Sequence, residues 1–273
     1  MNFLNGEQTE TITIADRGLQ YGDGVWETLA IRNGRVMQLP AHLARLKKGI
    51  NALSINGYRE SVLLEDIEQV LASAEPSELT SILKIIITRG VGGRGYNPQG
   101  CNQPNRIVSL HPWPKFIHDY ATEGVHITLC NNRLSHNPLL AGFKHLNRLE
   151  QVLARAEFSD EYQEGLVMDF QDNVIEGTMS NLFVIHSDTH ISTPDLTLCG
   201  IRGIARSCIL DELRDMGVEI DITNVSVDDI LQARGLFLTN SILQIWPVKQ
   251  FQQRHYGIPT VVKTLQERIK EKL

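Results

Sequence analysis

Alternating apolar and polar positions predict strands near the amino terminus. Thr11–Ile14 alternates in this way, and the stretches Val25–Arg32 and Arg35–Leu39 are joined by Asn33-Gly34. An Asn-Gly pair between two apolar runs is the strongest short signal for a two-residue β-hairpin. The amino-terminal segment is therefore predicted to form antiparallel strands.

A helical period replaces this alternation after Pro40. Proline suits the first turn of a helix, and the apolar residues that follow fall on one helical face. These residues are Leu43, Leu46, Ile50 and Leu53. A second helix is predicted from Arg59 to Ala74, and the apolar runs Ile82–Ile87 and Arg106–Leu110 are predicted to be neighbouring strands.

The rest of the chain mixes short strands with helices. Helices are predicted from Leu146 to Phe158 and from Ile204 to Met216. Strands are predicted at Val125–Cys130, Leu166–Phe170, Val174–Glu176, Leu182–Ile185, His190–Thr193, Val218–Ile222, Leu236–Thr239 and Ile245–Val248. Strands and helices that do not follow a strict βαβ rhythm indicate an α+β fold.

A change in composition at His111–Lys115 suggests a boundary between two subdomains. Two of these five residues are prolines, which stiffen an extended connector. We therefore place an amino-terminal α+β subdomain at residues 1–113 and a carboxy-terminal subdomain, which contains Lys144, at residues 114–273.

Composition and charge indicate a soluble metabolic enzyme. The chain has 42% hydrophobic and 21% charged residues and a net charge of −6, which argues against a nucleic-acid partner. The amino-terminal residues lack the features of a secretory signal, and no apolar run reaches the ~18 residues of a membrane span. The 4 cysteines form no CxxC pair and are expected to be reduced thiols. We expect a cytoplasmic protein that binds neither membrane nor nucleic acid.

The segment from Glu176 to Phe183, followed by Ile201–Arg206, brings an acid close to a predicted helix start. A carboxylate beside a pyridine nitrogen keeps that nitrogen protonated, so that the ring can take up electrons. The backbone N–H groups of Ile204 and Ala205, at the start of the helix, suit a phosphate. Taken alone, Glu176 could equally be an exposed turn residue.

Lys144 lies in an unusually apolar stretch, Leu139–Leu146. Loss of solvent disfavours an ammonium group and frees a nucleophilic amine for Schiff-base formation. Most lysines are solvated, so the residues alone also allow a surface role.

Gly90–Gly95 matches GxGxxG but lacks the helix that a dinucleotide site requires next. Tyr96-Asn97-Pro98 follows, which is typical of a loop. This loop either has only a structural role or brings Arg94 and Tyr96 to a ligand. His186 and His190 flank a turn, and no third ligand lies nearby in the sequence, so no metal is expected.

These segments resemble the fold type IV enzymes, which depend on pyridoxal 5′-phosphate (PLP) and include the branched-chain and D-amino acid aminotransferases. Lys144–Glu150 and Arg89–Tyr96 look most like the aminodeoxychorismate lyases, and the resemblance covers essentially the whole chain. It implies an α+β fold of two subdomains with the cofactor between them. It also implies a homodimer.

The resemblance also implies a role for each site residue. Lys144 binds the cofactor and acts as the catalytic base, and Glu176 pairs with the pyridine nitrogen. Phosphate and cofactor contacts are expected from Arg45, Ile204, Ala205, Asn240 and Ser241. Substrate contacts are expected from Arg94, Tyr96 and Asn240. Thr28 is expected to assist proton transfer. From the residues alone, Arg45 could be a solvated helix residue and Thr28 an ordinary strand residue.

The implied reaction is the conversion of 4-amino-4-deoxychorismate to 4-aminobenzoate and pyruvate in folate biosynthesis. One alternative is a D-amino acid or branched-chain aminotransferase, which would use the same Lys144 and Glu176. In D-amino acid aminotransferases a tyrosine stands at the position of Trp26, so this departure favours the lyase. The other alternative is a catalytically silent PLP-binding protein, which would not need Thr28.

Overall fold

The chain forms two compact units in a computed structural model, which describes residues 1–75, 79–116 and 118–273. The first unit is Met1–Pro114 with Phe143–Asn147, and the second is Lys115–Gly142 with Arg148–Leu273. Lys144 was predicted to lie in the carboxy-terminal subdomain, whereas Phe143–Asn147, the five residues that include it, pack with the first unit. These residues belong to the first unit because their backbone pairs with one of its strands.

The first unit is built on an antiparallel sheet with the strand order β2-β1-β6-β5-β3-β4. Its strands are β1 (Asn2–Leu4), β2 (Glu7–Gln8), β3 (Gly24–Arg32), β4 (Arg35–Val36), β5 (Ser81–Thr88) and β6 (Asn105–Pro112). Its helices are α1 (Arg17–Tyr21), α2 (Leu39–Ala52) and α3 (Glu60–Ala72). The structure confirms the pairing of β5 with β6, and it confirms the hairpin, where Asn33 and Gly34 have φ of 49° and 74°.

The predicted strand at Thr11–Ile14 is wrong. These residues belong to no strand, and Ile14 is 82% exposed, so the alternation does not bury an apolar side. The segment instead leads into Asp16, whose side chain accepts hydrogen bonds from Gly18 and Leu19 and caps α1. Four alternating residues are too short a pattern to specify a strand.

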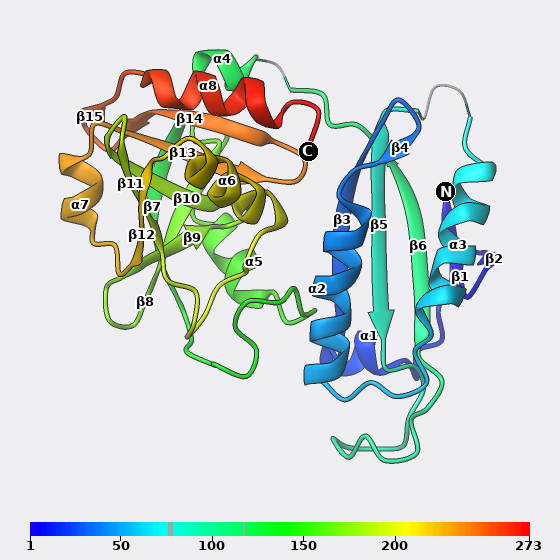
Figure 1. The fold of residues 1–273 in the computed structure, drawn as a ribbon. Helices are drawn as coiled ribbons and strands as arrows, with labels where there is room; N and C mark the ends of the chain where they lie inside the picture. The colour runs from blue at the N-terminus through cyan, green and yellow to red at the C-terminus, as the bar shows by residue number, and fades with distance from the viewer. Residues whose placement is uncertain (76–78, 117) are drawn as a thin grey trace. The chain divides into compact units, whose positions relative to one another are not determined.

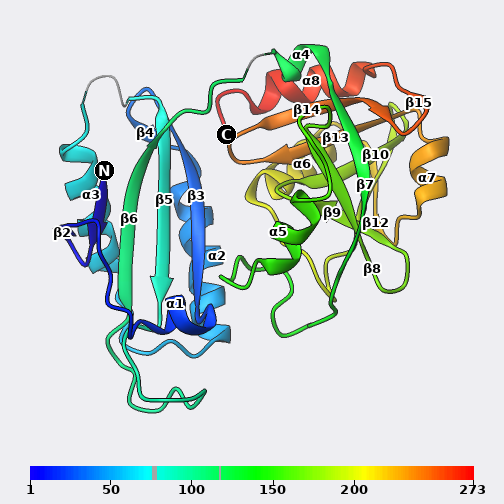
Figure 2. The same ribbon diagram turned by 180° about the vertical axis from the view of Figure 1, so that it is seen from behind.

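Helices α2 and α3 lie on one face of this sheet (Figure 1), and Figure 2 shows the opposite face. Val25 of β3 faces α2, because a Cβ added to Gly49 of α2 would lie 2.8 Å from a Val25 methyl carbon. Since side chains alternate along a strand, Glu27 points to the α2 side, while Trp26 and Thr28 point to the other.

The second unit contains a larger, mixed sheet with the order β12-β11-β10-β13-β14-β7-β8-β9, and β15 pairs with β14. Its strands are β7 (Val125–Leu134), β8 (Glu164–Asp169), β9 (Val174–Gly177), β10 (Asn181–Ser187), β11 (His190–Pro194), β12 (Glu219–Thr223), β13 (Gly235–Asn240), β14 (Gln244–Phe251) and β15 (Arg254–His255). Its helices are α4 (Tyr120–Glu123), α5 (Leu149–Arg155), α6 (Ile204–Asp215), α7 (Val227–Gln232) and α8 (Thr260–Ile269). Strand β7 runs parallel to β8 and β14, and β11 runs parallel to β12.

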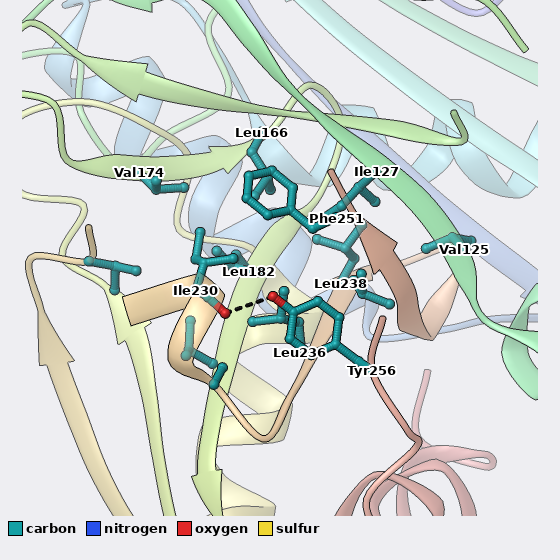
Figure 3. Packing of buried hydrophobic residues seen from close by; sticks show 14 of the residues in the cluster. Val125, Ile127, Leu166, Val174, Leu182, Ile230, Leu236, Leu238, Phe251 and Tyr256 are labelled. Carbon is teal, nitrogen blue, oxygen red and sulfur yellow. Dashed lines mark hydrogen bonds between the residues drawn. The ribbon is translucent and has the colours of Figure 1, made fainter. Parts of the chain in front are cut away.

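Buried apolar side chains form two main clusters in this unit. Figure 3 shows the first, in which Phe251 packs among aliphatic residues and the Tyr256 hydroxyl donates to the carbonyl of Ile230 at 2.7 Å. The second cluster joins α6 and α8 to the sheet through Phe183 and Phe237, whose rings stack with centroids 4.7 Å apart. Helix α6 is thereby anchored along its length. No helix in the described part of the chain is long and apolar enough to cross a membrane.

Candidate active site

Lys144 belongs to a short segment that extends the sheet of the first unit along β3. The Trp26 N–H donates to the Lys144 carbonyl at 2.8 Å, and the Leu146 N–H donates to the Gly24 carbonyl at 3.0 Å. Trp26 Nε1 also donates to the carbonyl of His145 at 3.2 Å. The amine of the half-buried Lys144 lies 3.8 Å from the centroid of the Trp26 ring. Trp26 thus fixes both the backbone of this segment and the position of its amine.

A second lysine and Thr28 lie around the same tryptophan. Lys84 of β5 pairs in register with Thr28, and its amine lies 5.2 Å from the centroid of the Trp26 ring. This face of the sheet therefore presents two amines and a hydroxyl. Lys84 was not among the site residues predicted from the sequence. The sequence feature that could have identified Lys84 is that it is a single cation in the otherwise apolar strand Ile82–Ile87.

On the α2 side of β3, a buried carboxylate connects two side chains of that helix. One oxygen of Glu27 accepts a hydrogen bond from Arg45 Nε at 2.8 Å, and the other accepts one from Arg45 Nη2 at 2.6 Å. His42 Nδ1 lies 2.6 Å from the second oxygen. Arg45, which the family resemblance implies as a phosphate ligand, is thus held by an ion pair and is only 11% exposed. It is not a freely solvated helix residue.

The protonation states of this cluster follow from its surroundings. Burial alone would raise the pKa of Glu27, but the charge and hydrogen bonds of Arg45 and the hydrogen bond from His42 lower it below the ordinary value. Burial lowers the pKa of His42, and the cations of Arg45 and Lys144 lower it further, although Glu27 opposes them. Glu27 is therefore ionised and His42 neutral at neutral pH. Since a carboxylate only accepts hydrogen bonds, His42 Nδ1 carries the proton.

The glycine loop after β5 is held by Arg17. Its guanidinium donates to the carbonyl of Gly95 at 2.9 Å and to that of Tyr96 at 3.1 Å. The loop follows Thr88, which pairs in register with Gly24, so it leaves the sheet at the same end as Trp26. Arg94 is exposed and Tyr96 is 83% exposed. Residues 91–104 contain no helix, which confirms that this GxGxxG is a loop and not a dinucleotide motif.

In the second unit, Glu176 is a buried residue of β9, so it is not an exposed turn glutamate. It is 4% exposed, and its Oε2 accepts the Ile201 N–H at 2.8 Å. Asn181 Nδ2 lies 3.5 Å from the same oxygen and donates to the Ile201 carbonyl at 2.9 Å. The carboxylate is therefore fixed against the segment that enters α6.

The start of α6 is a close-packed helix N-terminus. Its N-cap, Gly203, has no capping side chain and donates its own N–H to Asn181 Oδ1 at 3.1 Å. A Cβ at Gly203 would lie 2.1 Å from that oxygen, so any other residue here would have to displace the Asn181 side chain. The N–H groups of Ile204 and Ala205 belong to the first turn, which has no acceptor within the helix. Such a terminus attracts anions.

Arg206 of α6 has a structural role. Its Nε donates to Thr193 Oγ1 at 3.2 Å and its Nη2 donates to the Pro194 carbonyl at 3.0 Å. Burial and the nearby Arg202 lower the pKa of Arg206 to about 10. These contacts tie α6 to β11.

Asn240 links two turns of the second unit. Its Nδ2 donates to the Met179 carbonyl at 3.0 Å, and its Oδ1 accepts the N–H groups of Ile242 and Leu243 at 2.9 and 2.8 Å. Ser241 follows it and is half-buried. Contacts of Asn240 and Ser241 with a cofactor or substrate stay predictions.

Comparison with known proteins decides the family. The family described as amino-transferase class IV matches residues 24–251. The chain belongs to the class IV aminotransferases. This confirms the fold predicted from the sequence, and the Escherichia coli branched-chain aminotransferase, at 22% identity, shares it with a TM-score of 0.85 over 99% of this chain and 93% of that one.

Relatives named as lyases resemble this class IV chain over nearly its whole length. An aminodeoxychorismate lyase of Vibrio harveyi is 34% identical over 91% of this chain and 90% of its own. The crystal structure of 4-amino-4-deoxychorismate lyase from Pseudomonas aeruginosa is 38% identical, has a TM-score of 0.92, and covers 100% of this chain and 99% of its own. A putative branched-chain aminotransferase of Methanocaldococcus jannaschii is 28% identical over 98% of this chain and 95% of its own.

Proposed function

We propose that this protein is a PLP-dependent lyase that converts 4-amino-4-deoxychorismate to 4-aminobenzoate and pyruvate, a reaction of folate biosynthesis. The observation that carries the proposal is the similarity, over almost the whole chain, to relatives with that name. Trp26, in place of the tyrosine of D-amino acid aminotransferases, supports it further.

The chemistry of the residues fits PLP. The aldehyde of PLP requires a primary amine, its ring nitrogen an acid, and its phosphate N–H and guanidinium donors. Lys144 would supply the amine, and the buried carboxylate of Glu176 would bind the ring nitrogen. Arg45 and the glycine-capped start of α6, with Ile204 and Ala205, would hold the phosphate.

When bound, PLP supplies a cationic ring that accepts electrons from the carbon next to the substrate amine. The Lys144 amine removes the proton from that carbon, and the Trp26 ring restricts where this amine can lie. Glu176 holds a proton on the ring nitrogen. The C–O bond of the enolpyruvyl ether then breaks and the six-membered ring becomes aromatic. Thr28 relays the proton that Lys144 removed to the departing three-carbon group, which is released as pyruvate.

The substrate carries two carboxylates, which require cationic or polar anchors. We assign these to Arg94, Tyr96 and Asn240, and Lys84 adds a cation on the Trp26 face. Arginine suits this task because its planar donors match a carboxylate.

We also propose a cytoplasmic homodimer. Apolar side chains on α5 are exposed within one chain: Leu149 is 76% exposed, Val152 60% and Leu153 59%. An apolar face of this kind is typical of a surface that binds another chain. The 4 cysteines are free thiols, as expected in a reducing compartment.

The test compares two reactions of the PLP-loaded protein. In one, it receives 4-amino-4-deoxychorismate. In the other, it receives D-alanine or a branched-chain amino acid with a ketoacid acceptor. Formation of 4-aminobenzoate, with little amino-group transfer, supports the lyase. The reverse result contradicts it and favours the aminotransferase, which the similarity to the M. jannaschii relative makes the second candidate.

A further inference from the structure

Glu27 is a charged residue on the side of β3 that faces the core. It is 1% exposed, and its neighbours on that side, Val25 and Leu29, are equally buried. A buried carboxylate is costly unless it is paired and hydrogen-bonded. Glu27 therefore occupies this position only because α2 supplies partners for it.

Both partners come from one face of α2. His42 and Arg45 lie one helical turn apart and reach the same carboxylate. Arg45 contacts it at two points, through Nε and Nη2, which fixes the plane of the guanidinium as well as its position. His42, itself 1% exposed, contacts the same carboxylate oxygen as Arg45 Nη2.

Strand β3 connects this cluster to Lys144. Trp26 and Glu27 are adjacent and point to opposite faces; Trp26 holds the Lys144 segment and Glu27 holds Arg45. A single rigid strand thus sets the positions of an amine and a guanidinium.

We propose that Glu27 and His42 are positioning residues that hold Arg45 in the orientation that binds the cofactor phosphate. The proposal rests on the function proposed above, in which Arg45 binds that phosphate. Glu27 also balances the charge of Arg45 before the cofactor arrives, so the apoprotein does not bury an unpaired cation. Neither residue touches the cofactor.

The test separates the phosphate from the rest of the cofactor. Apoprotein is titrated with PLP and with pyridoxal, which lacks the phosphate, and binding is followed by absorbance. The measured quantity is the ratio of the two affinities in each variant relative to the same ratio in the wild type. This comparison cancels any difference in how the two aldehydes behave in solution. For Glu27→Gln we expect about a tenfold fall in this ratio, with pyridoxal affinity unchanged.

Matched variants make the test specific. Glu68→Gln, an exposed glutamate of α3, should leave the ratio unchanged. His42→Asn, which keeps an N–H donor near the position of Nδ1, should lower the ratio less than His42→Leu. In Arg45→Gln the ratio should fall, and adding Glu27→Gln should lower it no further. If Glu27→Gln does not fold, Glu27→Asp takes its place, with a smaller fall expected.

Two results would overturn the proposal. One is an unchanged ratio in Glu27→Gln. The other is an equal loss of PLP and pyridoxal affinity, which would mean that Glu27 only supports the fold. Failure of the proposed cofactor role looks different, because the wild-type protein would then bind no PLP or would not prefer PLP to pyridoxal. A protein that transfers amino groups and is not a lyase would still show this preference, so the ratio tests the role of Glu27 separately from the reaction.

Discussion

Removal of the Glu164 side chain should destabilise the second unit strongly. Glu164 is 1% exposed and its carboxylate accepts the backbone N–H groups of Gly165 at 3.0 Å, Thr178 at 2.9 Å and Met179 at 3.1 Å. It also accepts the hydroxyls of Thr178 and Ser180. These contacts hold the turn between Glu176 and Asn181.

The magnitude follows from the donors left without an acceptor. Each buried N–H that loses its acceptor costs about 1–3 kcal/mol. Hydroxyls can turn to other acceptors, and water can reach the N–H of Met179, which is 50% exposed. The N–H groups of Gly165 and Thr178 therefore dominate, and Glu164→Ala should lower the free energy of unfolding by about 2–6 kcal/mol. Glu164→Gln keeps one oxygen and should lose about half as much.

Urea unfolding, followed by tryptophan fluorescence, measures both variants. Glu219→Ala, which changes an exposed residue of β12, is the control and should have almost no effect. A loss below about 1 kcal/mol in Glu164→Ala, or a larger loss in Glu164→Gln than in Glu164→Ala, would refute the reasoning.

Two further predictions concern the ion pair of β3 and the start of α6. The pKa of Glu27 is lowered in the folded protein, so its pairing with Arg45 stabilises the fold above about pH 4.5, the ordinary value, and this contribution is lost as the pH falls through the folded pKa. Urea unfolding should therefore show a steeper loss of stability below that pH in the wild type than in Glu27→Gln; parallel curves would contradict this. Gly203→Ala should displace Asn181 and lower both the free energy of unfolding, by about 1–3 kcal/mol, and the affinity for PLP measured by absorbance titration. Gly257→Ala, where a Cβ meets nothing within 4 Å, is its control; equal effects in the two variants would count against the helix-start site.

Short sequence patterns correctly predicted those elements whose conformation depends mainly on residues close together in the chain. Asn33-Gly34 specifies its hairpin because both residues adopt positive φ there. The alternation of Thr11–Ile14 failed because a strand also needs a neighbouring edge and an apolar surface to cover. Sequence alone does not supply that information over four residues.

Contacts between distant residues could not be read from the sequence. Trp26 reaches the His145 carbonyl across a separation of 119 residues, so Lys144 was assigned to the wrong compact unit although its role had been proposed from its motif. The importance of Glu27 could have been recognised from the sequence, because a carboxylate between Val25 and Leu29 on a buried face requires a cationic partner. That the partner is Arg45 could not be predicted, because it depends on how α2 packs against the sheet.

The most direct test of the lyase assignment is the product balance with 4-amino-4-deoxychorismate. The PLP-loaded wild-type protein should release 4-aminobenzoate and pyruvate in equal amounts, and Lys144→Ala should release neither above background. Absence of 4-aminobenzoate from the wild type, or equal formation by Lys144→Ala, would contradict the account.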